Sequence, residues 1–251
     1  MSGPGFKDHF SGHASAYTRY RPGYPAELFK ALAALAPDAD CVWDCATGNG
    51  QAALGFAPHF ARVEATDASA EQIANALPHP KVHYTVVPAE ASGLKDRSVS
   101  LVSVAQALHW FDFERFYAEV RRAAKPDALL ACWSYELCHA NSDVDAVVEK
   151  LYRDLGDAYW PPERRHVEAG YRDIPFPFPQ VALPAFQMRA SWSLEHYLGY
   201  LRTWSAVRAY IKKNGRDPVN EMETELARAW GDPSKELQIA WPLNILAGYI
   251  V

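Results

Sequence analysis

The feature that most constrains this chain is a glycine-containing turn between an apolar strand and a helix. The turn reads Asp44-Cys45-Ala46-Thr47-Gly48-Asn49-Gly50 and lies between an apolar run, 41–44, and a helical pattern, 51–60. Glycine at such a turn permits positive φ and lets the backbone approach a ligand closely. A second strand pattern, 62–67, ends in Asp67, whose carboxylate can accept two hydrogen bonds from a ribose diol. These features predict a nucleoside-containing cofactor at the carboxyl edge of a parallel sheet.

The class of cofactor depends on Asp44. Residues 48–53 also match the G-x-G-x-x-A fingerprint of dinucleotide sites letter by letter. A carboxylate at the mouth of the strand would repel a pyrophosphate over this turn, whereas it would attract the ammonium and sulfonium groups of S-adenosylmethionine. Charge therefore favours S-adenosylmethionine, and an NAD(P)-dependent oxidoreductase remains the alternative.

The organisation of the chain changes after about residue 135. Before it, short apolar runs alternate with helical patterns, which is typical of a parallel sheet with crossover helices. The predicted strands are 41–44, 62–67, 82–87, 98–105 and 128–133. The elements expected later are a helix (144–155), a proline- and aromatic-rich cover (159–184), an amphipathic helix (193–212), a polar helix (220–230) and an apolar strand (237–251).

Several segments in the same order resemble motifs of class I S-adenosylmethionine-dependent methyltransferases. Residues 42–50 resemble the first motif, usually acid-x-G-x-G-x-G, with alanine in place of the first glycine. Residues 64–69 resemble the second motif, whose acid binds the ribose, and 88–90 is similar to the segment that flanks the adenine. Residues 106–112 and 17–25 resemble one subgroup, the trans-aconitate methyltransferase-like enzymes.

The resemblance implies a fold and a reaction. The fold is α/β: a Rossmann-like, seven-stranded, mostly parallel sheet with helices on both faces, plus a lid of helices and loops. One methyltransferase domain would occupy residues 1–251 and use S-adenosylmethionine as cofactor. Its expected parts are an N-terminal cover segment (1–24), a cofactor-binding core (25–135), a lid or substrate region (136–192 and 193–230) and a final strand (237–251).

The resemblance also assigns site residues. Those expected to bind the cofactor are Tyr20, Arg21, Asp44, Ala46, Gly48, Gly50, Asp67, Ala68, Ala89, Glu90 and Gln106. Those expected to bind the methyl acceptor are Tyr17, His109, Trp110, Trp204 and Arg208. His109 is the candidate catalytic group, as general base for a phenol, an amine or a carbon acid. A carboxylate acceptor would need no base, and Arg21 or Arg208 would orient it.

Composition and sequence patterns limit the classes of partner that we expect for this chain. The net charge of −5 gives no general attraction for nucleic acid or an anionic membrane. No apolar run approaches the ~20 residues of a membrane span, and no signal-peptide pattern opens the sequence. The four cysteines are expected to be buried free thiols, and no metal is expected. We therefore expect a cytoplasmic monomer or homodimer that methylates a small molecule, the alternative being a non-catalytic S-adenosylmethionine-binding protein.

Overall fold

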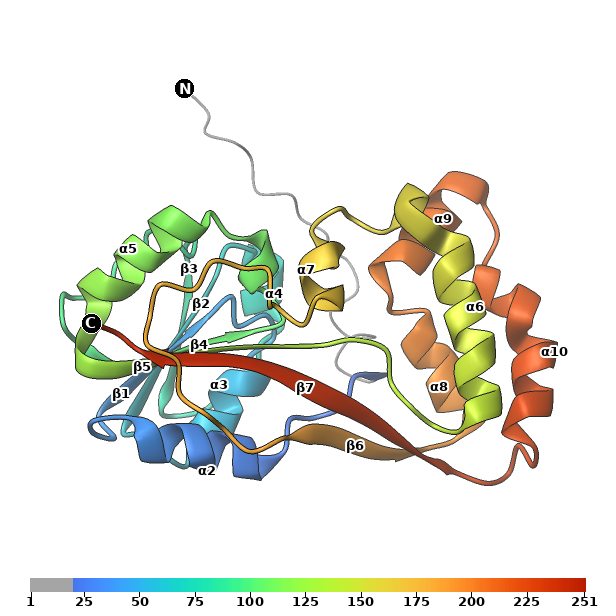
Figure 1. Ribbon diagram of the computed structural model, residues 1–251, viewed down its shortest axis with the longest axis horizontal. Coiled ribbons are helices and arrows are strands. Elements are labelled where there is room, and N and C mark those ends of the chain that lie inside the picture. Colours follow the sequence, from blue (N-terminus) through green and yellow to red (C-terminus); the bar gives the residue numbers. More distant parts are fainter. Residues whose placement is uncertain (1–19) are drawn as a thin grey trace.

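A seven-stranded sheet forms the centre of the computed structural model, which describes residues 20–251 (Figure 1). The strand order is β3-β2-β1-β4-β5-β7-β6. Strands β1 to β5 pair in parallel, and β7 pairs antiparallel with β5 and with β6, which confirms the predicted mostly parallel sheet. The strands are β1 Cys41–Cys45, β2 Arg62–Asp67, β3 Val82–Val86, β4 Val99–Ala105, β5 Ala124–Tyr135, β6 Gln187–Trp192 and β7 Leu237–Tyr249.

Helices cover both faces of the sheet, as predicted. Every residue of β1 is buried, because a central parallel strand packs against helices on both sides. On one face, α2 (Ala26–Leu35) and α3 (Gln51–Phe56) bury Phe29 and Phe56 in one core cluster. On the other face, α5 (Phe113–Ala123) buries Phe116 against Trp43 of β1 (Figure 1). A further helix, α4 (Ala70–Ala74), follows β2.

A group of four helices, which we call the helical lobe, lies beside the sheet beyond one end of β7 (Figure 1, right). It consists of α6 (Ser142–Tyr159), α8 (Leu194–Leu201), α9 (Ser205–Asn214) and α10 (Pro218–Trp230). Helix α6 begins after Asn141, whose side chain accepts hydrogen bonds from two backbone N–H groups of the first turn. A short helix, α7 (Arg164–Glu168), lies between this lobe and the sheet (Figure 1).

The structure corrects one predicted helix and adds two elements. The expected helix 193–212 is two helices, α8 and α9, because Trp204 has an extended backbone and the Thr203 hydroxyl donates to the carbonyl oxygen of Tyr200 at 2.6 Å. The apolar spacing continues across the break, so the sequence pattern gave no sign of it. The predicted cover 159–184 contains α7, and β6 lies inside the segment expected to be lid.

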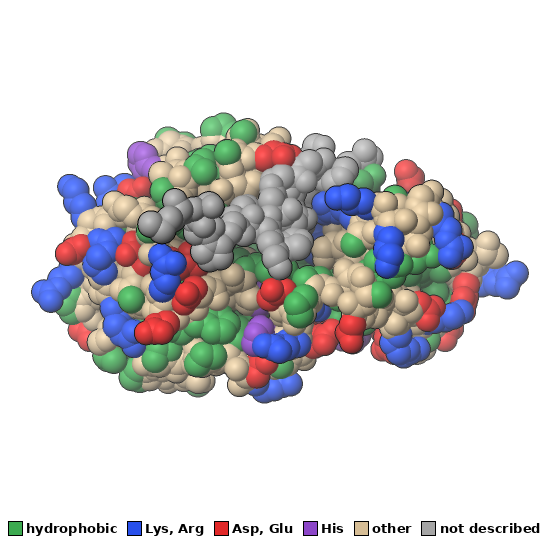
Figure 2. Space-filling view, turned by 90° about the horizontal axis from the view of Figure 1, so that it is seen from above, with side chains coloured by type: hydrophobic (Ala, Val, Ile, Leu, Met, Phe, Trp, Pro, Cys, Tyr) green, Lys and Arg blue, Asp and Glu red, His purple; other side chains and the backbone are tan. Residues whose placement is uncertain are grey.

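The surface and the cysteines bear on the class of protein. All four cysteines are buried and free, as predicted. Among the described residues, no helix is long and apolar enough to cross a membrane. Acidic and basic side chains are interspersed on the face seen in Figure 2.

Candidate active site

A cavity of about 560 Å³ lies at the carboxyl ends of the central parallel strands, where open α/β sheets bind their ligands. One side is built from the segments that follow β1, β2, β3 and β4. Residues 160–167 around α7 and the 200–205 junction of α8 and α9 form the other side. Ligands in it would thus be enclosed between the sheet and the helical lobe.

The glycine turn after β1 is held in a conformation that needs its glycines. Positive φ angles occur at Ala46 (55°), Gly48 (58°) and Gly50 (87°). A Cβ atom at Gly50 would also collide with the hydroxyl of Tyr84. Ala46 and Gly48 line the cavity. Gly50 is not among the lining residues; it is the N-cap residue of α3, and its positive φ completes the turn.

Asp67 ties the end of β2 to this turn. One carboxylate oxygen accepts the backbone N–H of Gly48 at 2.8 Å, and the other accepts that of Ser69 at 2.8 Å. Ser69 in turn caps α4, as predicted, by accepting the N–H of Gln72. Asp67 and Ala68 line the cavity, and a carboxylate at this strand end is the kind of group that accepts hydrogen bonds from ribose hydroxyls.

Asp44, which is expected to favour the cofactor through its charge, is not among the residues that line the cavity. Its carboxylate is fully buried beneath the turn, where it accepts hydrogen bonds from the hydroxyls of Thr47 at 2.5 Å and Ser103 at 2.7 Å. Burial raises the pKa of Asp44 to about 6, against the opposing effect of these hydrogen bonds. Asp44 therefore acts on a cofactor through the shape of the turn and through its charge at a distance.

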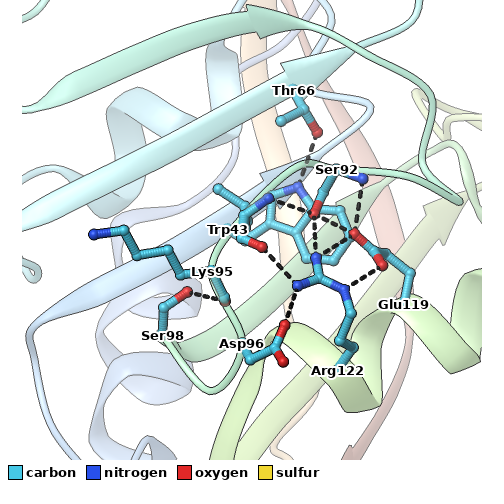
Figure 3. A network of polar contacts seen from close by, with 9 residues as sticks. Trp43, Thr66, Ser92, Lys95, Asp96, Ser98, Glu119 and Arg122 are labelled. Atoms are coloured by element: carbon cyan, nitrogen blue, oxygen red, sulfur yellow. Dashed lines mark hydrogen bonds and ion pairs between the residues drawn. The ribbon is translucent and has the colours of Figure 1, made fainter.

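The segment after β3 brings Ala89 and Glu90 to the cavity wall. Just beyond them, the N–H and hydroxyl of Ser92 donate to one oxygen of Glu119 at 2.8 and 2.5 Å. Arg122 donates to Glu119 and to Asp96, and thereby closes a network between this segment and α5 (Figure 3). The hydrogen bonds from Arg122 are the first cause that lowers the pKa of Glu119 to about 2. This network ties the segment that follows β3, which lines one side of the cavity, to α5.

Gln106 and Arg21 join separate parts of the wall. The side chain of Gln106 bonds both backbone polar groups of Tyr135, through Nε2 at 2.9 Å and Oε1 at 3.2 Å. Arg21 donates to the Tyr135 hydroxyl at 2.9 Å and to the Thr203 hydroxyl at 3.1 Å, with its guanidinium 5.2 Å from the ring centroid of Tyr200. Both residues line the cavity.

One predicted residue of the N-terminal segment, Tyr20, is not among the residues that line the cavity. Tyr20 packs away from it, with its ring centroid 5.0 Å from that of His196 and its edge against Gly199. Tyr17 lies outside the described residues. In this segment Arg21 therefore lines the cavity, and Tyr20 packs against the helical lobe instead.

On the acceptor side, His109, Trp110 and Trp204 line the cavity, and Arg208 does not. Arg208 donates to the carbonyl oxygen of Thr203 at 2.8 Å. The arginine of the lid that lines the cavity is Arg164 of α7.

The surroundings of Arg164 are aromatic. Its guanidinium carbon lies 4.9 Å from the ring centroid of Trp160 and 5.6 Å from that of Tyr152. Within residues 20–251, Nε donates to the Tyr152 hydroxyl at 3.1 Å, and neither Nη nitrogen is engaged in a hydrogen bond. The sequence signalled this region only through its aromatic content, which marked a cover but singled out no arginine.

His109 is nearly buried, with 9% of its surface exposed. Nδ1 lies 2.9 Å from the hydroxyl of Tyr171. Burial, aided by the charges of Arg164 and His166, lowers the pKa of His109 to about 3. The imidazole is therefore neutral at physiological pH and a weak base.

Known proteins similar to this chain are methyltransferases. Residues 43–132 match the family model of a methyltransferase domain. A protein of Dictyostelium discoideum named as a methyltransferase is 33% identical over 249 residues, which is 96% of this chain and 94% of that protein. A solved structure from Anaeromyxobacter dehalogenans, described as a type II methyltransferase, is 47% identical, covers 92% of this chain and 99% of its own, and has a TM-score of 0.87.

The cavity and these similarities agree. The glycine turn and Asp67 offer backbone and carboxylate groups suited to a nucleoside, and the buried carboxylate of Asp44 lies beneath them. The relatives that align along the whole chain are methyltransferases, so the nicotinamide alternative is set aside. The chain belongs to the class I S-adenosylmethionine-dependent methyltransferases.

Proposed function

We propose that this enzyme transfers the methyl group of S-adenosylmethionine to a carboxylate oxygen of a small organic acid. The observation that carries the proposal is Arg164, a cavity-lining guanidinium that within the described residues keeps both Nη nitrogens uncommitted. Such a planar fork binds a carboxylate through two parallel hydrogen bonds. The rings of Trp160 and Tyr152 hold it in place, and this reduces the entropy lost when the acid binds.

The weak basicity of His109 supports an acceptor that is already an anion. A phenol, an ammonium group or a carbon acid must lose a proton before or during methyl transfer, and an imidazole with a pKa of about 3 removes one poorly. A carboxylate is ionised at neutral pH and needs no base. The resemblance of residues 106–112 to the trans-aconitate methyltransferase-like enzymes is in keeping with such an acceptor.

The chain's own contribution to the rate is then alignment and exclusion of water. When bound, S-adenosylmethionine supplies an electrophilic methyl group on a sulfonium. The turn, Asp67 and the 88–90 segment would hold its nucleoside and amino-acid parts, and Arg21 would lie near its carboxylate. Holding two reactants in line is worth on the order of 7 kcal/mol or more. The aromatic side chains on the lobe side, Trp160 and Trp204, would keep water away.

A panel assay tests the acceptor class. The enzyme is incubated with methyl-labelled S-adenosylmethionine and matched sets of small carboxylic acids, phenols and amines, and products are identified by mass spectrometry and by the lability of methyl esters to alkali. We expect esters from the acids. Methylation confined to phenols or amines would contradict the proposal.

A pair of variants assigns the acid to Arg164. Arg164→Gln should raise KM for the acid at least about tenfold while the dissociation constant of S-adenosylhomocysteine stays the same. Arg165→Gln is the matched control, since Arg165 belongs to the same helix, carries the same charge and is exposed away from the cavity. Equal KM values in the two variants would contradict the role of Arg164.

A further inference from the structure

His109 and Tyr171 form a buried pair at the boundary between the sheet and the lid. His109 belongs to a single 3₁₀ turn (Leu108–Trp110) just after β4, and Tyr171 follows α7, which packs against that turn. Tyr171 is 1% exposed, and its hydroxyl lies 2.9 Å from Nδ1 of His109. Because the Nδ1 edge of the imidazole is turned to Tyr171, the opposite Nε2 edge is left for the cavity that His109 lines.

A hydrogen bond between a hydroxyl and a neutral imidazole can run in either direction, and burial decides which. Within residues 20–251, Nδ1 of His109 is the one side-chain partner of the Tyr171 hydroxyl. If His109 donated this bond, the phenol proton would be buried without an acceptor, an arrangement that native structures avoid. The backbone N–H groups of His109 and Leu108 also approach the phenol oxygen, and they can only donate to it. The phenol proton therefore goes to Nδ1.

Both groups keep these protonation states at neutral pH. Burial raises the pKa of Tyr171 well above its ordinary value, so the phenol retains its proton. Burial lowers the pKa of His109 to about 3, and the two charged groups that act on it in the described residues, Arg164 and His166, lower it further. A neutral imidazole that accepts at Nδ1 carries its own proton on Nε2.

We propose that Tyr171 is a positioning residue that fixes the His109 proton on Nε2, so that His109 offers the methyl acceptor a hydrogen-bond donor and not a base. This inference deepens the proposed function and rests on it for the identity of the acceptor, since a carboxylate oxygen is a partner for such a donor. Arg164 and His109, which line the same cavity, would then bind one carboxylate together. The reaction needs no proton transfer in this arrangement.

The tautomer can be measured without any acceptor. Long-range proton–nitrogen correlation spectra of enzyme with ¹⁵N-labelled histidine distinguish Nε2–H from Nδ1–H imidazole, and the His109→Gln variant assigns the His109 signals. We expect a single Nε2–H tautomer in the wild type and a mixture in Tyr171→Phe. Tyr117→Phe is the control, because Tyr117 is also buried and donates one hydrogen bond, to the carbonyl oxygen of Pro175, outside the cavity. A wild-type Nδ1–H tautomer or an imidazolium would overturn the inference.

A kinetic comparison separates a donor from a base. Glutamine can place an amide N–H where Nε2–H of histidine lies, whereas alanine cannot. With the acid that is methylated fastest in the panel, His109→Gln should show a KM several-fold lower than His109→Ala, and both variants should keep a kcat close to that of the wild type. If both variants lose kcat alike, a base is at work and the inference fails. If no acid is methylated while the Nε2–H tautomer is observed, the proposed acceptor fails and the tautomer stands.

Discussion

The buried carboxylate of Asp44 accepts a hydrogen bond from the Ser103 hydroxyl at 2.7 Å, and this bond joins the neighbouring strands β1 and β4 directly beneath the cofactor turn. The enzyme thus keeps an ionisable group in its interior at the point where a cofactor with a sulfonium and an ammonium group would bind above it. A negative charge in that place would favour binding of the cofactor, and because it is buried it lowers the free energy of unfolding.

Asp44→Asn should therefore stabilise the protein and weaken cofactor binding. Because burial raises the folded-state pKa of Asp44 from 3.8 to about 6, its contribution to stability is greatest below pH 3.8 and is lost as pH rises to about 6. A rise of two pKa units corresponds to about 3 kcal/mol. Urea unfolding at about pH 7.5 should show a gain approaching that size, and the gain should vanish near pH 4.

The control is Asp154→Asn, which removes an exposed carboxylate from α6. Calorimetry should show weaker binding of S-adenosylmethionine to Asp44→Asn and unchanged binding to the control. A less stable Asp44→Asn protein at pH 7.5 would contradict the account of this residue.

Glu119→Gln should lower the stability of the enzyme and its affinity for S-adenosylhomocysteine, because Glu119 ties the segment after β3 to α5. It weakens the bonds from Ser92 and Arg122, and hydrogen bonds to a charged group are worth about 2 kcal/mol. The pKa of Glu119 is lowered to about 2, so its contribution is present above its usual value of 4.5 and is lost as pH falls towards 2. The difference in unfolding free energy between variant and wild type should thus shrink in acid. Glu114→Gln, exposed on the same helix, should have little effect on stability or on S-adenosylhomocysteine affinity.

Gly50→Ala should destabilise the enzyme through Tyr84. An added Cβ carries both the strain of positive φ, about 1 kcal/mol, and the collision with the Tyr84 hydroxyl. Gly215→Ala is the matched control, because that glycine also has positive φ and nothing lies within 4 Å of an added Cβ. The melting temperature should fall further for Gly50→Ala, and adding Tyr84→Ala should recover part of the difference. Equal melting temperatures for the two single variants would count against the collision.

The rate of methyl transfer should not follow a histidine titration. Burial lowers the pKa of His109 to about 3, so the imidazole stays neutral as pH falls through its usual value of 6.5. With S-adenosylmethionine saturating, so that the titration of Asp44 near pH 6 does not limit cofactor binding, kcat/KM for an acid should thus be flat from about pH 5.5 to about pH 8.5. A profile that rises with an inflection near pH 6.5 and is abolished in His109→Gln would contradict this.

Local sequence patterns were enough to predict which segments of the parallel sheet lie at the cavity. Each parallel strand is a short apolar run that ends at a turn, so each such turn marks a segment at the carboxyl edge of the sheet. Gly48 and Asp67 could be singled out because a positive-φ turn and a strand-end carboxylate are local features, and both line the cavity. The sequence shows that Asp44 lies at a strand end, but it does not show whether its side chain points into the cavity or beneath the turn.

The other side of the cavity, formed by α7 and the helical lobe, depends on packing between segments that are distant in sequence. Arg164 and Arg208 are both arginines of helical segments beside aromatic residues, and only the packing of α7 between the sheet and the helical lobe brings Arg164 to the cavity. Tyr171, 62 residues from His109, has no sequence signal as its partner. The break between α8 and α9 was not predicted because it too depends on packing between distant segments. Trp204, at the break, is buried by neighbours from other helices, among them Tyr152 of α6.

The central claim is that the glycine turn and Asp67 hold S-adenosylmethionine at the sheet edge, and calorimetric titration tests it most directly. S-adenosylmethionine, S-adenosylhomocysteine and NADH are titrated into the wild type and into Asp67→Ala. The account predicts that both sulfur nucleosides bind the wild type, that NADH does not, and that the variant loses about tenfold or more in affinity. Binding of NADH, or equal affinity of wild type and variant for S-adenosylhomocysteine, would contradict it.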